Sequence, residues 1–328
     1  MQPTLPPPTS TSRHARRFIR LSWGTVVVVY LLILAGGIVR ATGSGMGCPD
    51  WPKCFGQWVP PTHESQLPPD YQTRYATAHI GVEPFNAAKT WTEYLNRLLG
   101  AITGLLVVGV FLASLPLRPS DGLLTWVAGA VVVLVGLQAW LGKLVVERNL
   151  HGGTVTLHML LALLIVGLLI WVAQRPLRAQ LAAFAPLPLA LAWGCVALDG
   201  VQVALGTQVR EAVDVVAATA TDRSEWLQVV GGRFSVHRSF SLLVLGAAVV
   251  QCVAVWPHRH HRPMAGYLVA SVGALGLALG LGLVLAYGDL PTWAQPLHLV
   301  VGTLLVGVHL FGAVAVTTVY ATKRTPQA

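Results

Sequence analysis

Long apolar segments are the feature of this sequence that most constrains its fold. Eight of them lie along the 328 residues, and each is close to the ~20 residues that a helix needs to cross a bilayer. Strands are excluded there, because a strand outside a closed barrel leaves backbone polar groups unpaired in lipid. We therefore predict an all-α membrane protein with eight transmembrane helices. The segments are Leu21–Val39, Leu98–Leu117, Leu123–Gly142, Gly153–Gln174, Pro186–Gly206, Ser239–Trp256, Gly266–Tyr287 and Leu297–Val319.

The overall composition agrees with a chain that lies mostly in lipid. Hydrophobic residues make up 54% of it and charged residues 11%, whereas soluble domains carry about 25% charged residues. The net charge is +9, but the basic residues flank apolar segments and form no soluble basic surface. We predict a lipid bilayer as the partner and no nucleic acid.

Basic residues in short flanks predict the orientation in the membrane. Arg13, Arg16, Arg17 and Arg20 precede the first segment, and the short connections on the same side contain one acid, Asp121. Short basic flanks stay in the cytoplasm. We therefore expect a bacterial inner-membrane protein with both termini cytoplasmic. Residues 1–20 would be a disordered basic tail and 321–328 a second tail, with the long loop 40–91 on the periplasmic side.

The chain reads as two similar halves, residues 21–174 and 186–320. Asn96 precedes His158 by 62 residues, and His237 precedes His298 by 61. Arg40 and Arg210 follow the first apolar segment of each half. Matched polar residues at matched spacing indicate duplication, so we expect two four-helix bundles.

Four polar residues lie at one predicted depth in these bundles. Asn96, His158, His237 and His298 each fall near the start of an even-numbered helix, which places a facing pair in each bundle core, where cofactor sites are built. An intramembrane histidine is a functional hypothesis by default; the alternative is an interhelical hydrogen bond. Paired imidazoles suit haem iron, whereas zinc needs three or four clustered ligands.

For two other polar residues inside the predicted spans, the sequence gives weaker evidence of a function. His309 shares a helix face with His298 but lies eleven residues deeper, so we expect a structural residue or a second-choice ligand. Asp199 is expected to pair with a base near the outer face or to make a polar contact between helices.

Two cysteines lie close together in the long loop. Cys48 and Cys54 are separated by five residues that include two prolines, which suits a disulfide on an oxidising face. Metal binding and thiol exchange remain alternatives. Cys195 and Cys252 lie inside apolar segments and are expected to be small core residues.

Several strings together resemble the haem A synthase family, from about residue 20 to 320. They are "GGIVRATGSGMGCPDWPKCFGQWVPP" (Gly36–Pro61), "WTEYLNRLLGAITG" (Trp91–Gly104), "VTLHMLLAL" (Val155–Leu163), "GTQVRE" (Gly206–Glu211), "HRSFS" (His237–Ser241) and "PLHLVVG" (Pro296–Gly302). The loop string is the most specific of these.

The resemblance implies a reaction and a set of sites. Two successive oxygenations convert a methyl group of haem O into the formyl group of haem A. Haem b would be held by His237 and His298 as an electron relay, and the substrate haem by His158. The family's essential acid matches Glu93, and its disulfide matches Cys48 and Cys54. Molecular oxygen, an unidentified electron donor, a haem O synthase and a terminal oxidase are the implied partners.

The helix-2 motif departs from the family's pattern. The usual Glu-x-x-His ends here in Asn96, a poor iron ligand, so we expect His158 to hold the substrate iron alone. His79 and His151 are alternative ligands, although their positions favour ordinary loop histidines.

Two roles are open for Glu93, one catalytic and one structural. It shares one helix face with Asn96, which suits proton delivery or substrate orientation. The structural reading is a salt bridge to Arg40 or Lys143, because Arg97 is expected to point elsewhere on the helix.

Two other classes of function compete with the synthase. A di-haem membrane cytochrome that only transfers electrons would explain the paired histidines but would give Glu93 no task. A transporter with inverted repeats would use Asp199, but halves of four segments each start on the same side of the membrane and are parallel.

Overall fold

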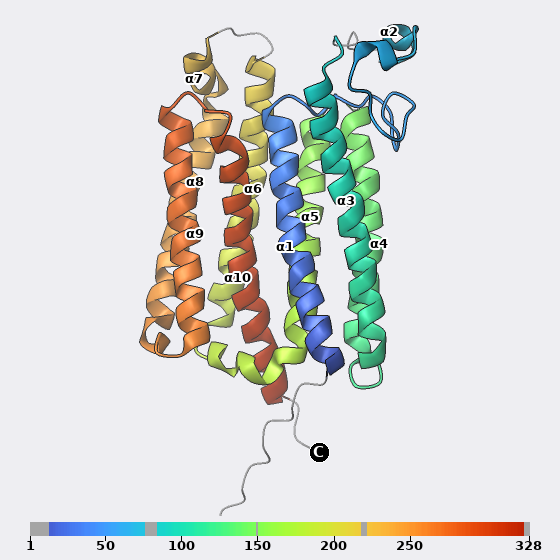
Figure 1. Ribbon diagram of the computed structural model, residues 1–328. Coiled ribbons are helices and arrows are strands. Elements are labelled where there is room, and N and C mark those ends of the chain that lie inside the picture. Colours follow the sequence, from blue (N-terminus) through green and yellow to red (C-terminus); the bar gives the residue numbers. More distant parts are fainter. Residues whose placement is uncertain (1–12, 76–83, 149, 218–221, 325–328) are drawn as a thin grey trace, which may run out of the picture.

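The computed structural model describes residues 13–75, 84–148, 150–217 and 222–324 (Figure 1). Within these residues there is no β-strand, and eight helices are long and apolar enough to cross a membrane. The predicted fold class is confirmed. The helices are α1 (Arg13–Ala41), α3 (Ala87–Ser114), α4 (Gly122–Glu147), α5 (Gly152–Gln174), α6 (Leu189–Ala217), α8 (Gly232–Val255), α9 (Arg262–Tyr287) and α10 (Ala294–Arg324).

Several helices extend beyond the apolar segments that predicted them. Helix α1 begins at Arg13, inside the stretch expected to be a disordered tail, because arginine is a good helix former and its long side chain can reach water from the end of a span. Helix α10 likewise continues to Arg324. Helix α6 continues to Ala217, past the predicted end at Gly206, and its charged extension is stabilised by ion pairs.

The two ends of the molecule differ in their connections. At one end lie the long loop between α1 and α3, with the short helix α2 (Tyr71–Arg74), and the short helix α7 (Trp226–Val230). We call this the long-loop end. At the opposite, short-turn end lie the α3–α4, α5–α6 and α8–α9 connections, together with the start of α1 and the end of α10 (Figure 1).

Each half of the chain packs as a ring of four helices. In the first half α1 packs on α3 and α5, and α4 packs on α3 and α5; in the second, α6 and α9 each pack on α8 and α10. The helices that carry the paired polar residues, α3 with α5 and α8 with α10, therefore stand diagonally across their rings. In a four-helix arrangement, diagonal side chains face the central core, where ligand sites are built.

The two halves share a broad interface. Helices α1 and α5 pack on α10, and α5 also packs on α6. Hydrogen bonds cross this interface from Tyr30 Oη to Thr303 O (3.2 Å), between the hydroxyls of Thr156 and Thr207 (2.8 Å), and from Gln174 Nε2 to Phe311 O (3.0 Å).

The long loop has a small aromatic core of its own. Phe55 is buried and packs edge-on against Tyr71, Tyr75 and Phe85, with ring centroids 5.5–6.3 Å apart. The loop is thus a packed cap at the long-loop end.

Candidate functional site

His237 and His298 face each other across the C-terminal ring. Their ring centroids lie 6.4 Å apart. Metal–imidazole bonds are about 2 Å long, so two such ligands on opposite sides of one metal hold their ring centroids about 6 Å apart. The described residues contain no group of three or more His, Cys, Asp or Glu side chains that could hold a metal ion. The pair therefore fits a metal that needs two axial protein ligands, as haem iron does.

A glycine of the adjacent helix lies against each ring. A Cβ added at Gly206 of α6 would stand 3.2 Å from Cε1 of His237, and one at Gly282 of α9 would stand 3.4 Å from Cε1 of His298. Such contacts are at or below ordinary van der Waals distance, so a larger side chain at either position would push the imidazole away. The sequence alone gave neither glycine a role.

The N-terminal ring repeats this arrangement with one substitution. His158 of α5 lies against Gly142 of α4, where an added Cβ would stand 3.4 Å from Cε1 of the histidine. Asn96 of α3 lies against Gly36 of α1, where an added Cβ would stand 3.9 Å from Oδ1 of the asparagine. The Nδ1 atom of His158 and the Oδ1 atom of Asn96 are buried without a hydrogen-bond partner. An unpaired buried polar atom costs about 1–3 kcal/mol, which suits a site completed by a polar or metal-bearing ligand.

A glutamine supports one histidine in each half. Gln138 Nε2 donates to the backbone carbonyl of His158 (3.0 Å), and Gln202 Nε2 donates to that of His237 (3.2 Å). Each glutamine precedes the contacting glycine by four residues, Gly142 or Gly206. Sequence reasoning missed both; the shared Gln-x-x-x-Gly spacing was the available signal.

Glu93 is buried and fully engaged. Only 3% of it is exposed, and its Oε2 accepts a hydrogen bond from the backbone N–H of Cys48 at 2.8 Å. Its Oε1 forms an ion pair with Arg97, whose Nε lies 3.1 Å away. The expectation that Arg97 points elsewhere was wrong, because residues four apart lie on one helix face.

The salt-bridge partners expected for Glu93 are used elsewhere. Arg40 pairs with Asp214 at 2.7 Å, and Lys143 pairs with Glu147 at 3.1 Å. Arg210, the counterpart of Arg40, also pairs with Asp214 at 2.7 Å. Arg40 and Arg210 thus share one carboxylate between the two halves of the chain.

Arg97 fastens the long loop to α3. Beyond its ion pair, it donates to the backbone carbonyls of Cys48 (2.8 Å), Asp50 (2.5 Å) and Lys53 (3.2 Å). Gly47 allows the loop to approach closely, since a Cβ there would stand 2.6 Å from the carbonyl oxygen of Lys89. The loop therefore sits directly on the helix turn that precedes Asn96.

The loop cysteines form a disulfide. Cys48 and Cys54 are bonded to each other and wholly buried, so neither thiol is free to bind metal. Cys195 is free and buried, and Cys252 is free and partly buried, as expected of core residues.

Among the described residues, His309 and His151 do not join either site. His309 Nδ1 lies 2.6 Å from Asp199 Oδ2, which gives both residues a partner across helices. His151 is the exposed residue before α5, and His79 lies outside the described residues.

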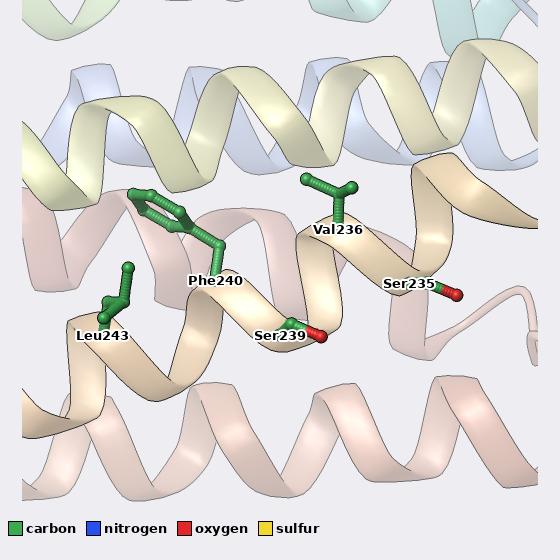
Figure 2. A pocket seen from close by; sticks show the side chains of 5 residues that line it. All are labelled: Ser235, Val236, Ser239, Phe240 and Leu243. Atoms are coloured by element: carbon green, nitrogen blue, oxygen red, sulfur yellow. The ribbon is translucent and has the colours of Figure 1, made fainter.

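A surface hollow of about 400 Å³ lies along α8 and is lined by residues that flank His237 in the sequence, from Ser235 to Leu243. Figure 2 shows that all five of its lining side chains project from α8. Val236 and Leu243 are 54% and 58% exposed, and neither His237 nor His298 lines the hollow. The hollow is therefore separate from the paired-histidine site.

Several known proteins are similar in sequence to this chain, two of them over most of its length. A "Heme A synthase" of Rhizorhabdus wittichii is 28% identical over 310 residues, covering 88% of this chain and 86% of that protein. Another, of Sphingopyxis alaskensis, is 27% identical, covering 88% and 89%. A third, of Shewanella oneidensis, is 30% identical over 156 residues, covering 47% and 44%. The COX15-CtaA family model, described as "Cytochrome oxidase assembly protein", matches residues 19–310. With its eight membrane helices and its paired polar sites, the chain belongs to the COX15-CtaA family of cytochrome oxidase assembly proteins.

Proposed function

We propose that this chain is a haem A synthase that oxidises a methyl group of haem O to a formyl group. The observation that carries the proposal is the pair of matched diagonal sites, one with two facing imidazoles and one with a single imidazole. Two sites of unequal ligation suit two tasks, electron supply and substrate binding. The names and coverage of the relatives support the same activity.

In the C-terminal ring, His237 and His298 would hold haem b. Two neutral imidazoles favour six-coordinate iron with no open position, and bound haem supplies one-electron redox chemistry. Gly206 and Gly282 leave room for both rings, and Gln202 fixes the backbone that carries His237. The role of this half would be to relay electrons.

In the N-terminal ring, His158 would hold the iron of haem O. Asn96 stands on the diagonal helix and offers an amide rather than an imidazole, so one side of the substrate site is left free for molecular oxygen. Gln138 fixes the backbone of His158. The chain's own task here is to bind and orient the substrate.

Glu93 would act as a positioning residue through the long loop. Both its carboxylate oxygens are engaged, by Arg97 and by the N–H of Cys48, which favours substrate orientation over proton delivery. With Asn96 three residues further on α3, the Glu93–Arg97 pair holds the loop over the substrate site, where it excludes water.

The setting of the reaction follows from the predicted orientation. We propose an inner-membrane protein with cytoplasmic termini and a periplasmic long loop, consistent with a disulfide in that loop. Haem O synthase would supply the substrate and a terminal oxidase would take the product.

Haem analysis of expressing cells tests the proposal. In a bacterial host that makes haem O but no haem A, the chain should yield haem A by extraction and mass analysis, and His158→Ala should abolish it. An electron-transfer cytochrome would show a low-spin haem b spectrum without haem A, and a transporter would show neither. Absence of haem A from cells with well-folded protein and available haem O would reject the activity.

A further inference from the structure

A buried ionisable pair lies in the C-terminal half, away from the paired histidines. Asp199 of α6 and His309 of α10 are 3% and 1% exposed, and Oδ2 of the aspartate lies 2.6 Å from Nδ1 of the histidine. Ionisable groups inside a membrane are expensive and usually functional. The proposed haem sites use neither residue.

Polar side chains of α6 and α9 lie beside this pair, and a cysteine of α8 lies next to them. On α9, the Tyr267 ring crosses to α10, since a Cβ added at Gly312 would stand 2.8 Å from its hydroxyl oxygen. Tyr267 also interacts electrostatically with Asp199. Cys195 on α6 interacts with Asp199 and with Cys252 on α8, and Ser271 on α9 lies beside Tyr267.

The hydrogen-bonding capacity of this cluster is not used up. Nε2 of His309 and the hydroxyl oxygen of Tyr267 are buried without a hydrogen-bond partner. Such atoms are costly when unpaired, and internal water is their usual partner in proteins. The cluster is therefore suited to hold water and to exchange protons.

The cluster is linked to the haem site along α6. Asp199 lies three residues before Gln202, which donates to the backbone carbonyl of His237, and these positions share one helix face. His309 is eleven residues beyond His298, about 16 Å along α10. The pair is thus too deep to ligate the haem iron, yet it shares the low-dielectric interior with it.

We propose that Asp199 and His309 form a proton-accepting site coupled to reduction of the haem between His237 and His298. The proposal rests on the proposed function, which places haem b there. A one-electron reductant converts ferric iron to ferrous iron, and one proton moves from water to the pair. The Asp199 carboxylate balances the extra positive charge of the ferric haem. When reduction removes that positive charge, protonation neutralises the negative charge of the Asp199–His309 pair.

Charge balance explains why uptake should accompany reduction. In a low-dielectric interior, an uncompensated charge interacts far more strongly than in water. The other titratable groups that face the pair are Cys195 from α6, Cys252 from α8 and Tyr267 from α9, and thiols and phenols ordinarily stay neutral at pH 7. The buried residues of α5 between Leu163 and Ala173 are apolar.

Redox titration of the purified full-length protein at pH 6, 7 and 8 tests the proposal. The midpoint potential of the low-spin haem should fall as pH rises, and Asp199→Asn should remove most of this dependence while keeping the low-spin spectrum. The matched control is Asp121→Asn, which removes a carboxylate at the short-turn end of the other half. An unchanged pH dependence in both Asp199→Asn and His309→Leu would overturn the proposal, as would a pH-independent wild type.

A second variant and a second readout guard against misfolding. If Asp199→Asn fails to accumulate, the apolar double variant Asp199→Leu/His309→Leu avoids an unpaired buried charge and should show the same flat potential. Reduction-induced infrared difference spectra of the wild type should show a carboxyl band that shifts in Asp199→Glu. A wild type without low-spin haem would reject the haem assignment itself, whereas low-spin haem with a pH-independent potential would reject the proton site alone.

Discussion

Glu93 and Arg97 form an ion pair one turn apart on α3, and Arg97 uses its other N–H groups on three loop carbonyls. The pair therefore joins the long loop to the helix that carries Asn96. A substitution at Glu93 should therefore loosen the attachment of the loop more than it weakens haem binding.

We expect Glu93→Gln to lower haem A formation at least tenfold while haem stays bound. Leaving Arg97 buried without its carboxylate should destabilise this region by about 3 kcal/mol, and limited proteolysis should cut the loop faster. Haem content, haem A yield and cleavage rate are measured together, with the exposed pair member Glu147→Gln as control. Loss of haem A with a loop as protease-resistant as the wild type would favour direct proton delivery instead.

Gly206→Val should displace the imidazole of His237 and reduce the low-spin haem signal by more than half. The reason is steric, since even a Cβ at this position would stand 3.2 Å from the ring. Gly200→Val on the same helix is the matched control, because a Cβ at Gly200 meets nothing within 4 Å. Equal visible spectra for the two variants would contradict the predicted contact.

His158→Ala should abolish haem A formation, whereas Asn96→Ala should lower it by no more than about threefold, because an amide ligates iron weakly. Asn96→His should add a second imidazole and increase the low-spin signal of the N-terminal haem. Haem A yield and optical spectra of the three variants provide the check. An Asn96→Ala variant as inactive as His158→Ala would show that Asn96 has a specific role.

Thiol labelling of unreduced, denatured protein should modify only two of the four cysteines, Cys195 and Cys252. After reduction all four should react. Closing this short loop should stabilise it by roughly 2–3 kcal/mol, so Cys48→Ser and Cys54→Ser should each accelerate loop cleavage. Labelling of Cys48 and Cys54 before reduction would rule out the bridge.

Asp121→Asn should destabilise the protein by about 1–2 kcal/mol at pH 7, between exposed and buried ion pairs. Burial alone would raise the pKa of Asp121, but hydrogen bonds from Arg175 and the N–H of Leu124, with the charges of Arg175 and Arg178, hold it below its ordinary value. Because folding lowers the pKa of this carboxyl group, its charge stabilises the folded protein. The stabilisation is fully present above the pKa of the unfolded state, about 3.9. It is lost as the pH falls through the lower pKa of the folded state.

Thermal unfolding in detergent at pH 7 and pH 3 checks the Asp121 prediction. The difference between Asp121→Asn and the wild type should shrink at pH 3, while the exposed control Asp70→Asn should match the wild type at both values. A difference that is the same at both pH values would show that the carboxylate charge contributes nothing.

The fold was predictable because the bilayer imposes one length and one kind of segment. Every predicted span overlaps one of the eight long helices. Helix ends were less predictable. Beyond Gly206, α6 buries Val213 and Val216 in a cluster with Leu290, and its Arg210 shares Asp214 with Arg40. That partnership spans 174 positions between Arg40 and Asp214, and no local pattern reveals it.

The facing pair of histidines was predictable from the sequence, whereas the residues that contact the candidate site were not. His237 and His298 stood out because imidazoles are rare in membrane helices. Gly206 carries no side chain, and its importance comes only from the register of α6 against α8. The direction of the Arg97 side chain was predicted wrongly, because the prediction considered its position next to Asn96 and not its four-residue spacing from Glu93. The Asp199–His309 contact depends on the pairing of two helices 110 positions apart.

The carboxylate shared by Arg40 and Arg210 distinguishes the two halves of the chain. Asp214 follows Arg210 by four residues, but the corresponding position after Arg40 is Ser44. Two copies of the N-terminal half would bring two arginines together with no acid between them, and two copies of the C-terminal half would have an acid for each arginine. One half of each kind gives two cations on a single anion, so removal of the Asp214 carboxylate would leave both arginines without this charge partner.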